Sequence, residues 1–330
     1  MSFTPTPFAT PVVAPTTITS YRSAPYISVS EYRFAPTTVG TKNLNPGPTN
    51  ETDSDFVLAE TILRASGMMD EYVFHGRQEA SLAATLVTEQ MAAKPKPNGS
   101  LVLICNFKPT MVIGVATGPN PSQMTNISSS AANTILVGET TITLPNIAGE
   151  VIVGNQPDSG GPFYGWGPTL AIYSYVTGWP HATLGANVAQ GATSLTLTPA
   201  FAGDSQIYGL LAGQAFKIVD DDLTETVVVE SVSGLTVTLK SGTLYAHTVP
   251  QAPDSIPVTS LPWFVEQACI SATSFLLKAR GFGSQVAGAF GSATPGQRKT
   301  MAEKGMLSDY DVVCGLLHPL RRAYYHGLSG

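Results

Sequence analysis

Charged side chains are scarce in this sequence: Asp, Glu, Lys and Arg make up 12% of its 330 residues, about half of the ~25% that is usual for soluble domains. The apolar share is 43%, which is enough to bury a core and excludes global disorder. No apolar run approaches the ~18 residues that a membrane-spanning helix needs. The sequence is therefore that of a globular protein, and its length predicts about two or three domains.

Basic residues are unevenly distributed along a chain whose net charge is −6. No Lys or Arg lies between Lys108 and Lys217. Because phosphate binding needs clustered cations, the central third does not read nucleic acid. The last 53 residues instead hold seven of the 17 basic residues against three acidic ones. This mildly basic end has two interpretations, a solvated helix face or a surface that contacts an acidic partner.

Cysteine is also rare, and the N-terminus has no basic leader. Cys105, Cys269 and Cys314 are far apart and odd in number, so neither a disulfide framework nor a zinc site is indicated. We expect each of the three to behave as a small buried hydrophobe. The chain reaches its first basic residue only at Arg22, unlike a signal peptide, and an intracellular origin is therefore expected.

Proline and threonine dominate residues 1–27, where five prolines exclude a helix and favour extended conformations. An extended arm of this kind cannot bury enough surface on its own to offset the entropy that it loses on ordering. We therefore expect a neighbouring subunit to hold this arm.

Residues 28–80 predict two helices, of which the first is short. Ser28 and Glu31 have the spacing of a capping box, in which each side chain bonds the backbone N–H of the other residue. Pro36 ends this helix, because proline has no N–H and restricts the residue before it.

The second helix is expected from about Asp55 to Val73. Ser54 or Asp53 is its predicted N-cap, and His75-Gly76 is its predicted end. Its apolar residues recur at helical spacing and are Phe56, Ala59, Ile62, Leu63, Met69, Tyr72 and Val73.

Residues 81–255 are expected to be β structure in two parts. Residues 81–177 contain short apolar runs bounded by Gly, Pro or Asn, which is typical of strands. These runs are LAATLVTEQ, SLVLICNF, TMVIGVAT, TILVGETTITL and EVIVG. In residues 178–255 the runs SLTLT, QAFKIV, TETVVVESV and LTVTLK recur with turn residues between them. This regular spacing predicts a separate small β-sandwich or barrel.

Residues 256–330 return to helix. One helix is expected to open at Leu261-Pro262-Trp263 and to end at Gly281, and a final helix is expected to have Ser308 as its N-cap. The face of the first is Phe264, Ala268, Ala272, Phe275, Leu276 and Ala279, and that of the last is Tyr310, Val313, Leu316, Leu317, Leu320 and Tyr324.

Helix at both ends of the chain, with β structure between them, predicts an α+β fold. Residues 28–80 and 256–330 carry apolar stripes that each need a partner. We therefore expect these two segments to form one discontinuous helical bundle. Residues 81–177 and 178–255 are then a long β-rich insertion, which contains the small β-sandwich or barrel.

The most suggestive catalytic motif is the hexapeptide PDSGGP at residues 157–162, which differs by one residue from the GDSGGP around the nucleophile of chymotrypsin-like proteases. In that family a His base precedes the serine in the chain, and only His75 precedes Ser159. His75 follows a predicted helix and lacks the Ala-His-Cys context of those proteases. A Gly/Pro turn explains the hexapeptide equally well, so a serine hydrolase acting through Ser159 is the less favoured alternative.

The remaining candidate sites are weaker. Asp220, Asp221 and Asp222, with Glu225 nearby, offer carboxylates to a hard cation such as calcium, but they lack EF-hand spacing, and an acidic hairpin tip is the better explanation. The Gly-rich residues 281–296 contain no phosphate-binding motif after a strand and are interpreted as a connector that another subunit orders. The five His form no ligand pair. The sequence therefore predicts no catalytic residue, no metal and no cofactor.

Two stretches carry a family resemblance. The first is YISVSEY at residues 26–32 with APT at residues 35–37, followed after a linker by DFVLAETILRAS at residues 55–66. The second is an Ala-rich helix ending in KARG at residues 278–281, followed by DYDVVCGLLHPLRR at residues 309–322. These stretches resemble the opening and closing segments of the head-to-tail adaptor (connector, or head completion) proteins of long-tailed bacteriophages.

The resemblance implies a non-enzymatic, structural virion protein. Such proteins form a homo-oligomeric ring, commonly a dodecamer, beneath the portal protein, and genomic DNA passes through the lumen without specific binding. The tail completion or tail terminator protein is the implied partner on the tail side. The implied location is the head–tail neck of the virion, after assembly in the bacterial host cytoplasm.

Several physical features fit this expectation. Low charge suits a surface that neighbouring subunits cover, and a Pro/Thr arm and a Gly-rich loop suit segments that become ordered on a neighbour. An acidic lumen would keep sliding DNA from sticking. Residues 192–229 resemble β inserts of phage virion proteins. A virion surface decoration or receptor-binding module built on residues 178–250 is therefore the alternative function.

Overall fold

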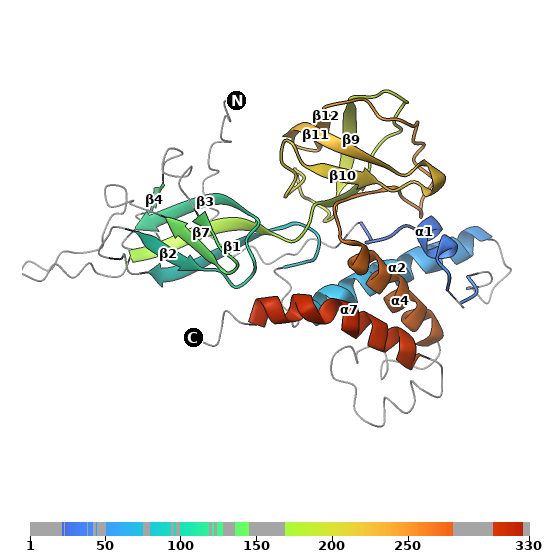
Figure 1. Ribbon diagram of the computed structural model, residues 1–330, viewed down its shortest axis with the longest axis horizontal. Coiled ribbons are helices and arrows are strands. Elements are labelled where there is room, and N and C mark those ends of the chain that lie inside the picture. The colour runs from blue at the N-terminus through green and yellow to red at the C-terminus, as the bar shows by residue number, and fades with distance from the viewer. Residues whose placement is uncertain are drawn as a thin grey trace, which may run out of the picture.

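The structure, a computed structural model, has a mixed α+β fold. It describes residues 22, 24–37, 39–41, 44, 51–74, 80–93, 96, 100–118, 121, 124–127, 136–144, 169–279 and 306–325. Figure 1 shows a barrel in yellow, sheets in green and helices in blue, orange and red. Within the described residues, no helix combines the length and the apolar character needed to cross a membrane.

Helix α1 (Val29–Phe34) is short, and two reciprocal hydrogen bonds fix its start. The Glu31 N–H donates to Ser28 Oγ over 3.0 Å, and the Ser28 N–H donates to the Glu31 carboxylate over 2.7 Å. These bonds satisfy amides that the first turn of a helix leaves without partners. The C-cap is Ala35, directly before Pro36. The predicted capping box and the predicted end of this helix are confirmed.

Helix α2 (Glu51–Phe74) starts earlier than the sequence predicts. Ser54 and Asp53 lie inside the helix, so the predicted N-cap is wrong. The Ser54 hydroxyl instead accepts a hydrogen bond from the backbone N–H of Leu44 over 3.3 Å, and it thus ties the preceding chain to the first turns. His75-Gly76, the predicted end, directly follow the helix and lie outside the described residues.

The buried face of α2 also differs from the predicted stripe at one end. Phe56 is 52% exposed, whereas Leu58 is fully buried. Residues two apart on an α-helix point about 200° apart, so burial of Leu58 turns Phe56 toward solvent. The buried apolar residues of this helix are Leu58, Ile62, Ala65, Met69, Tyr72, Val73 and Phe74.

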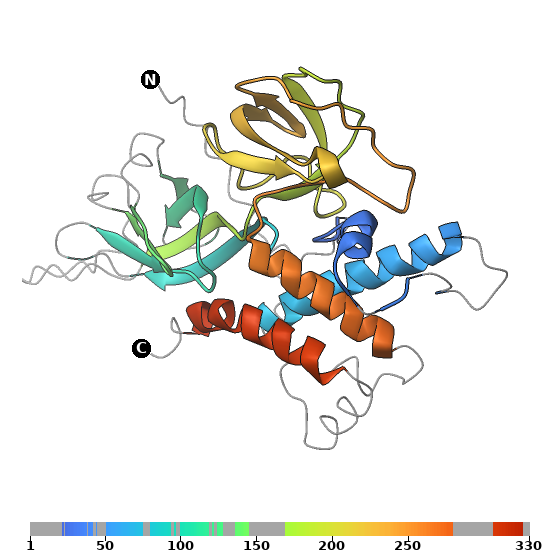
Figure 2. The same cartoon turned by 45° about the vertical axis from the view of Figure 1, so that its right-hand side comes forward.

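Helices α4 (Trp263–Ala279) and α7 (Leu307–Tyr325) pack against each other, and both contact α2. Figures 1 and 2 show the three helices side by side. Ser308 lies inside α7, so its predicted role as N-cap is wrong. The helix starts before Ser308 because Met306 is buried beside Phe275 and Tyr310. The Met306 carbonyl accepts the Tyr310 N–H over 3.1 Å, which is a helical hydrogen bond.

Two antiparallel sheets precede the barrel, with strand orders β1-β7-β3-β4 and β2-β6-β5. Their strands are β1 (Thr85–Ala93), β2 (Leu101–Ile104), β3 (Met111–Gly118), β4 (Thr125–Asn126), β5 (Leu136–Val137), β6 (Thr141–Leu144) and β7 (Thr169–Thr177). The apolar runs predicted as strands between residues 82 and 144 thus contain strands. The run EVIVG at residues 150–154 lies outside the described residues.

The closed barrel has the strand order β10-β11-β12-β9-β8-β13. Its strands are β8 (His181–Leu184), β9 (Ser194–Pro199), β10 (Ala215–Ile218), β11 (Glu225–Ser233), β12 (Thr236–Leu239) and β13 (Pro257–Thr259). Exposed and buried residues alternate along β9 and β10, because one face of each strand lines the interior. Of the two predicted architectures, sandwich or barrel, the barrel is confirmed.

Strand β13 lies beyond residue 255, the predicted end of this β insert, and pairs with β8 and β10. A three-residue strand that begins with proline has too little alternation to be recognised in the sequence. The barrel therefore closes with residues that were expected to belong to the helical segment at residues 256–330.

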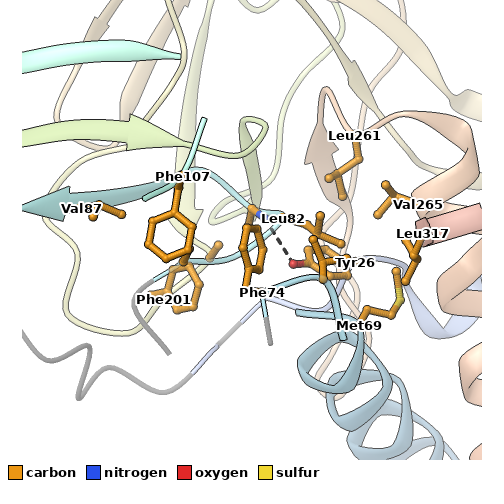
Figure 3. Close-up of a cluster of buried hydrophobic side chains, with 14 of the residues drawn as sticks. Tyr26, Met69, Phe74, Leu82, Val87, Phe107, Phe201, Leu261, Val265 and Leu317 are labelled. Carbon is orange, nitrogen blue, oxygen red and sulfur yellow. Dashed lines mark hydrogen bonds between the residues drawn. The ribbon is translucent and has the colours of Figure 1, made fainter. Parts of the chain in front are cut away.

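Apolar side chains are buried in two large clusters. One fills the barrel and includes Leu195, Val229 and Val237. The other joins the helices to the sheets and also takes in Phe201 from beside the barrel. Figure 3 shows part of this larger cluster, in which Tyr26 lies close to Leu82. A smaller cluster lies between α4 and α7.

Candidate functional site

Four polar side chains, Arg22, Tyr26, Asp70 and Ser81, form what we call the junction cluster. The Arg22 guanidinium pairs with the Asp70 carboxylate and donates to the hydroxyls of Tyr26 (2.7 Å) and Ser81. The Tyr26 hydroxyl in turn donates to Asp70 over 2.5 Å. The Arg22 and Asp70 side chains are only 8% and 15% exposed. The cluster is thus a nearly buried ion pair with the additional hydrogen bonds that buried charges require.

The junction cluster lies where several parts of the molecule meet. Asp70 belongs to α2 and also accepts the backbone N–H of Leu82 over 2.9 Å, in the chain that leads to β1. The backbone N–H of Ala83 donates to the Tyr26 hydroxyl over 3.2 Å, and Figure 3 shows a dashed hydrogen bond that ends at Tyr26. The Arg22 guanidinium carbon lies 5.2 Å from the ring centroid of Phe201, next to the barrel.

Burial and charge together set the protonation of the junction cluster. Burial lowers the pKa of Arg22, but the Asp70 carboxylate and Tyr26 outweigh this and raise it above its ordinary value. Burial also raises the pKa of Tyr26 well above its ordinary value, so the phenol keeps its proton. The cluster therefore holds a permanent cation against a carboxylate, which suits a structural clamp.

His181 is a second buried group at this junction. Its Nε2 lies 2.7 Å from the Pro25 carbonyl oxygen, and its Nδ1 lies 3.0 Å from the Thr259 hydroxyl. Because a carbonyl only accepts, Nε2 carries the proton and Nδ1 accepts from Thr259. Burial lowers the pKa of His181 to about 3. Such a weak, buried base cannot activate the Thr259 hydroxyl at neutral pH, so this pair ties β8 and β13 to the N-terminal chain.

A histidine between two carboxylates lies at one end of the barrel. His247 is fully buried; its Nδ1 lies 2.8 Å from Asp220 and its Nε2 lies 2.9 Å from Glu225. Glu225 also accepts the backbone N–H groups of Leu244 (2.8 Å) and Tyr245 (3.2 Å). Each ring nitrogen of His247 therefore faces one carboxylate, and the ring links the segment after β10 and strand β11 to the loop after β12.

The pKa of Glu225 is lowered even though burial acts to raise it. The hydrogen bonds from Leu244, His247 and Tyr245 outweigh burial, because they stabilise the ionised carboxylate. Glu225 is therefore an anionic anchor for the loop that contains these residues.

The predicted acidic hairpin tip is observed after β10. Asp221 and Asp222 are exposed on the short 3₁₀-helix η1 (Asp221–Leu223), whereas Asp220 bonds His247 and Glu225 is buried. Within the described part of the chain, no group of three His, Cys, Asp or Glu side chains is arranged to hold a metal ion.

The sheets hold a further, half-buried network around Glu89 of β1. The hydroxyls of Tyr173 (3.0 Å) and Tyr175 (2.5 Å) donate to its carboxylate, as does the backbone N–H of Asn106 (3.1 Å). Burial and the Glu89 charge raise the pKa of the neighbouring Cys105 to about 12, so this thiol stays protonated and unreactive at neutral pH. Nothing in the sequence spacing marks this network.

The cysteine predictions are confirmed for two residues. Cys105 and Cys269 are buried free thiols, whereas Cys314 is a free thiol that is half-buried. Burial raises the pKa of Cys269 to about 12. None of the three pairs in a disulfide.

A pocket of about 260 Å³ opens between the end of α1, α4 and the start of α7. Its lining carries an ion pair between Lys278 Nζ and Asp309, 2.7 Å apart, and several hydroxyl groups. The lining residues are Pro36, Thr37, Gln267, Ile270, Ser271, Ser274, Lys278, Ser308 and Asp309. The lining contains neither His nor Cys, and the amine of its Lys278 is held in the ion pair with Asp309.

Several sequence-based predictions lie outside the described residues. They are residues 1–21 and 23 of the predicted arm at residues 1–27, His75, His326, the hexapeptide with Ser159 and the Gly-rich residues 281–296. The end of the arm was expected to be held by a neighbouring subunit, but Ala24, Tyr26 and Ile27 are buried in the larger apolar cluster of their own chain, so that expectation is wrong for these residues. Three histidines lie within the described residues and fit the prediction of core or surface side chains, since His181 and His247 are buried and His318 is exposed.

Comparison with family models, with curated proteins and with solved structures finds no match for this chain. The described residues contain, in three separate places, a nearly buried ion pair, a buried His between two carboxylates and a Tyr–Glu network. Each group ties together parts of the chain that lie far apart in sequence.

Proposed function

We propose that this chain is a structural virion protein that forms a ring between the portal and the tail of a long-tailed bacteriophage. In this proposal, both ends of the chain build a discontinuous helical adaptor domain. The β sheets and the barrel are insertions in that domain. The ring lets DNA pass and provides a docking surface for the tail.

The observation that carries this proposal is the packing of the two segments that resemble adaptor proteins. Tyr32 of the first segment lies 2.9 Å, hydroxyl to hydroxyl, from Ser274 of α4. Leu58 and Ile62 of α2 share one buried cluster with Leu317 of α7. The two segments that resemble adaptor proteins lie at opposite ends of the chain. They can belong to one domain only if they pack against each other, as they do through these contacts.

The proposed partners follow from the same resemblance. They are further copies of this chain in a ring, expected to be a dodecamer, the portal protein on the head side, and the tail completion or terminator protein on the tail side. Genomic DNA would pass through the lumen without specific binding. The net charge of −6 supports this, because an acidic surface repels DNA.

The stoichiometry of the purified full-length chain tests the proposal. Native mass spectrometry should detect a closed oligomer of about twelve copies, either alone or on a purified portal ring, and particles should contain the chain at the head–tail neck. A chain that stays monomeric alone and with portal, and that is absent from particles, would contradict it. Deletion of the barrel that abolishes surface attachment but leaves assembly intact would favour a decoration or receptor-binding module instead.

A further inference from the structure

The pocket between the end of α1, α4 and the start of α7 is a docking site in its own right, and we call it the helical pocket. Its volume of about 260 Å³ lies just below the ~300 Å³ at which small-molecule pockets begin, so it suits a side chain or a short chain segment. Two residues of its lining, Ser271 and Ser274 of α4, are only 8% and 4% exposed. The Ser274 hydroxyl is fixed 2.9 Å from that of Tyr32. A wall ordered in advance loses little conformational entropy on binding.

The charges in the helical pocket are already paired. Lys278 Nζ lies 2.7 Å from the Asp309 carboxylate, and these side chains are 22% and 19% exposed. A charged group that entered the pocket would lose water without gaining a free counter-charge. The pocket therefore fits an uncharged segment. The other polar groups of its lining are neutral hydroxyls and an amide, from Thr37, Ser271, Ser274, Ser308 and Gln267.

Apolar residues lie beside these neutral polar groups. Pro36 and Ile270 belong to the lining of the helical pocket. Phe34, two residues before Pro36, ends α1 and is 77% exposed. Exposed aromatic rings are typical of surfaces that bind proline-rich segments, whose extended backbone loses little entropy on docking. The helical pocket thus favours an occupant that is both uncharged and rich in proline.

The N-terminus of the chain itself has this composition. Residues 1–21, which we call the N-terminal arm, have no charged side chain, four prolines and six threonines, with Phe3 and Phe8 near the start. At the ~3.1 Å per residue of a polyproline helix, 21 residues span about 65 Å. The N-terminal arm is therefore long enough to reach a neighbouring copy.

The residues that follow the N-terminal arm favour the pocket of a second copy. Arg22 forms an antiparallel β-bridge with Phe201 next to the barrel, and the Ala24 N–H donates to the Ala200 carbonyl over 3.2 Å. From there the chain runs through α1 to Pro36, which lines the helical pocket. A stiff proline-rich segment that continues this path backwards leads away from the pocket of its own chain.

We propose that the N-terminal arm of one copy docks in the helical pocket of a second copy. The contact is heterologous, with a different surface on each copy, and its repetition closes a ring where the rotation between copies allows it. The inference rests on the proposed function, since a ring requires each copy to touch two neighbours, and it names one contact between them.

Photo-cross-linking of the full-length protein tests the contact directly. Benzoylphenylalanine in place of Phe3 or, in a separate protein, of Phe8 should give cross-linked dimers whose peptides map to residues 267–278 or 306–309. The same probe in place of Thr236, an exposed position on β12, should give at least about tenfold less of this product. Cross-links from both arm positions only within one chain, or only to other surfaces, would overturn the proposal.

A filled pocket provides a second test. Gln267 lines the helical pocket from an exposed position on α4, so Gln267→Trp should fill it without disturbing the core. Self-association, measured by sedimentation over a range of concentrations, should weaken about tenfold, which is the loss of one good contact. Gln90→Trp, at an exposed position on β1, is the matched control and should leave association unchanged.

A charged arm links the two surfaces in one experiment. Phe3→Asp with Phe8→Asp should weaken association as much as Gln267→Trp does, because an unpaired carboxylate is costly to bury. Combining the arm and pocket changes should cause little further loss, since both remove the same contact. Fully additive losses, or wild-type rings with unchanged assembly of these variants, would overturn the contact but not the ring. A wild-type chain that never self-associates would overturn both.

Discussion

At the scale of single residues, Arg22 is expected to be the most sensitive charged position. Arg22→Met leaves the Asp70 carboxylate nearly buried without its cation, so the free energy of unfolding should fall by about 3–5 kcal/mol. Chemical denaturation followed by tryptophan fluorescence measures this, since Trp179 packs against the same apolar cluster. The control is Arg64→Met, which removes an exposed pair with Glu60 and should change stability by less than about 1 kcal/mol.

A second variant separates charge from packing at this position. Arg22→Met combined with Asp70→Leu removes both charges, and it should recover much of the lost stability because no charge remains buried alone. If the double variant is as unstable as the sum of the single variants, the ion pair is not the cause.

Glu31 should make stability depend on pH. Burial raises its pKa from 4.5 to about 7, although its hydrogen bonds with Ser28 act in the other direction. A carboxyl group with a raised pKa binds protons more tightly in the folded state, so it favours folding at low pH. That contribution is fully present below about 4.5 and is lost as the pH rises through about 7. The free energy of unfolding should therefore fall by about 1–3 kcal/mol over this range.

The matched variant for this effect is Glu31→Gln, which keeps an oxygen acceptor for the Ser28 N–H but does not ionise. Urea denaturation between pH 4.5 and 8 should give a flatter profile for the variant than for the wild type. Some slope should remain, because burial also raises the pKa values of Asp254 and Glu266. Identical profiles for both proteins would show that Glu31 is not the titrating group.

Residue-level predictions from sequence succeed where the partners are close in the chain. The capping box joins Ser28 to Glu31, three residues apart, and spacing alone reveals it. Arg22 and Asp70 are 48 residues apart, and their pairing depends on the packing of the N-terminal chain against α2. Local spacing cannot reveal such a pair, because the fold has to bring the two side chains together first.

At the scale of elements, Gly178 fixes the connection between β7 and the barrel. It has a φ of +87°, and a Cβ there would lie 2.7 Å from the carbonyl oxygens of Ser81 and Ala83. Gly178→Ala should therefore lower the free energy of unfolding by about 2–5 kcal/mol, through backbone strain and a clash with main-chain atoms.

Gly191 provides the matched control for this substitution. It has a similar φ of +80°, but a Cβ there would meet nothing within 4 Å. Gly191→Ala should therefore cost only the strain, about 1–2 kcal/mol. Denaturation of both variants in parallel measures the difference, and equal losses would mean that the crowding at Gly178 has no effect on stability.

Elements with a clear periodic pattern are predicted well, and their ends are not. The alternation in β9 and β10 is a direct consequence of one face lining the barrel, so it is visible in the sequence. The start of α7 depends on Met306, whose burial against Phe275 and Tyr310 is a tertiary effect. Phe56 on α2 is exposed because another face of the helix meets α4 and α7. The apolar stripe in the sequence does not determine which face that is.

At the scale of the whole molecule, the two large apolar clusters stabilise two different parts of the structure. The barrel cluster and the helix–sheet cluster share no buried residue. The described links between the two parts include polar contacts, such as His181 with Pro25 and the backbone N–H of Val29 with Asp254 (2.9 Å), and the burial of Phe201 in the larger cluster. The turn-punctuated spacing of residues 178–255 already indicated a separate unit. The contribution of Phe201 to the larger cluster was not predictable, because it depends on where the barrel docks.

Two equal truncations, one in each cluster, test this division. Leu195 in the barrel and Leu317 in α7 are both fully buried, so Leu195→Ala and Leu317→Ala remove the same atoms and should each destabilise their own part by about 2–5 kcal/mol. Distant sites act independently when they share no partners. Hydrogen exchange with mass spectrometry in increasing urea should therefore show Leu195→Ala lowering the protection of the barrel strands alone, and Leu317→Ala that of the helices α2, α4 and α7 together with the sheets that share their cluster. If each variant lowers the protection of both parts equally, the polar links at the junction couple the barrel and the helices into one cooperative unit.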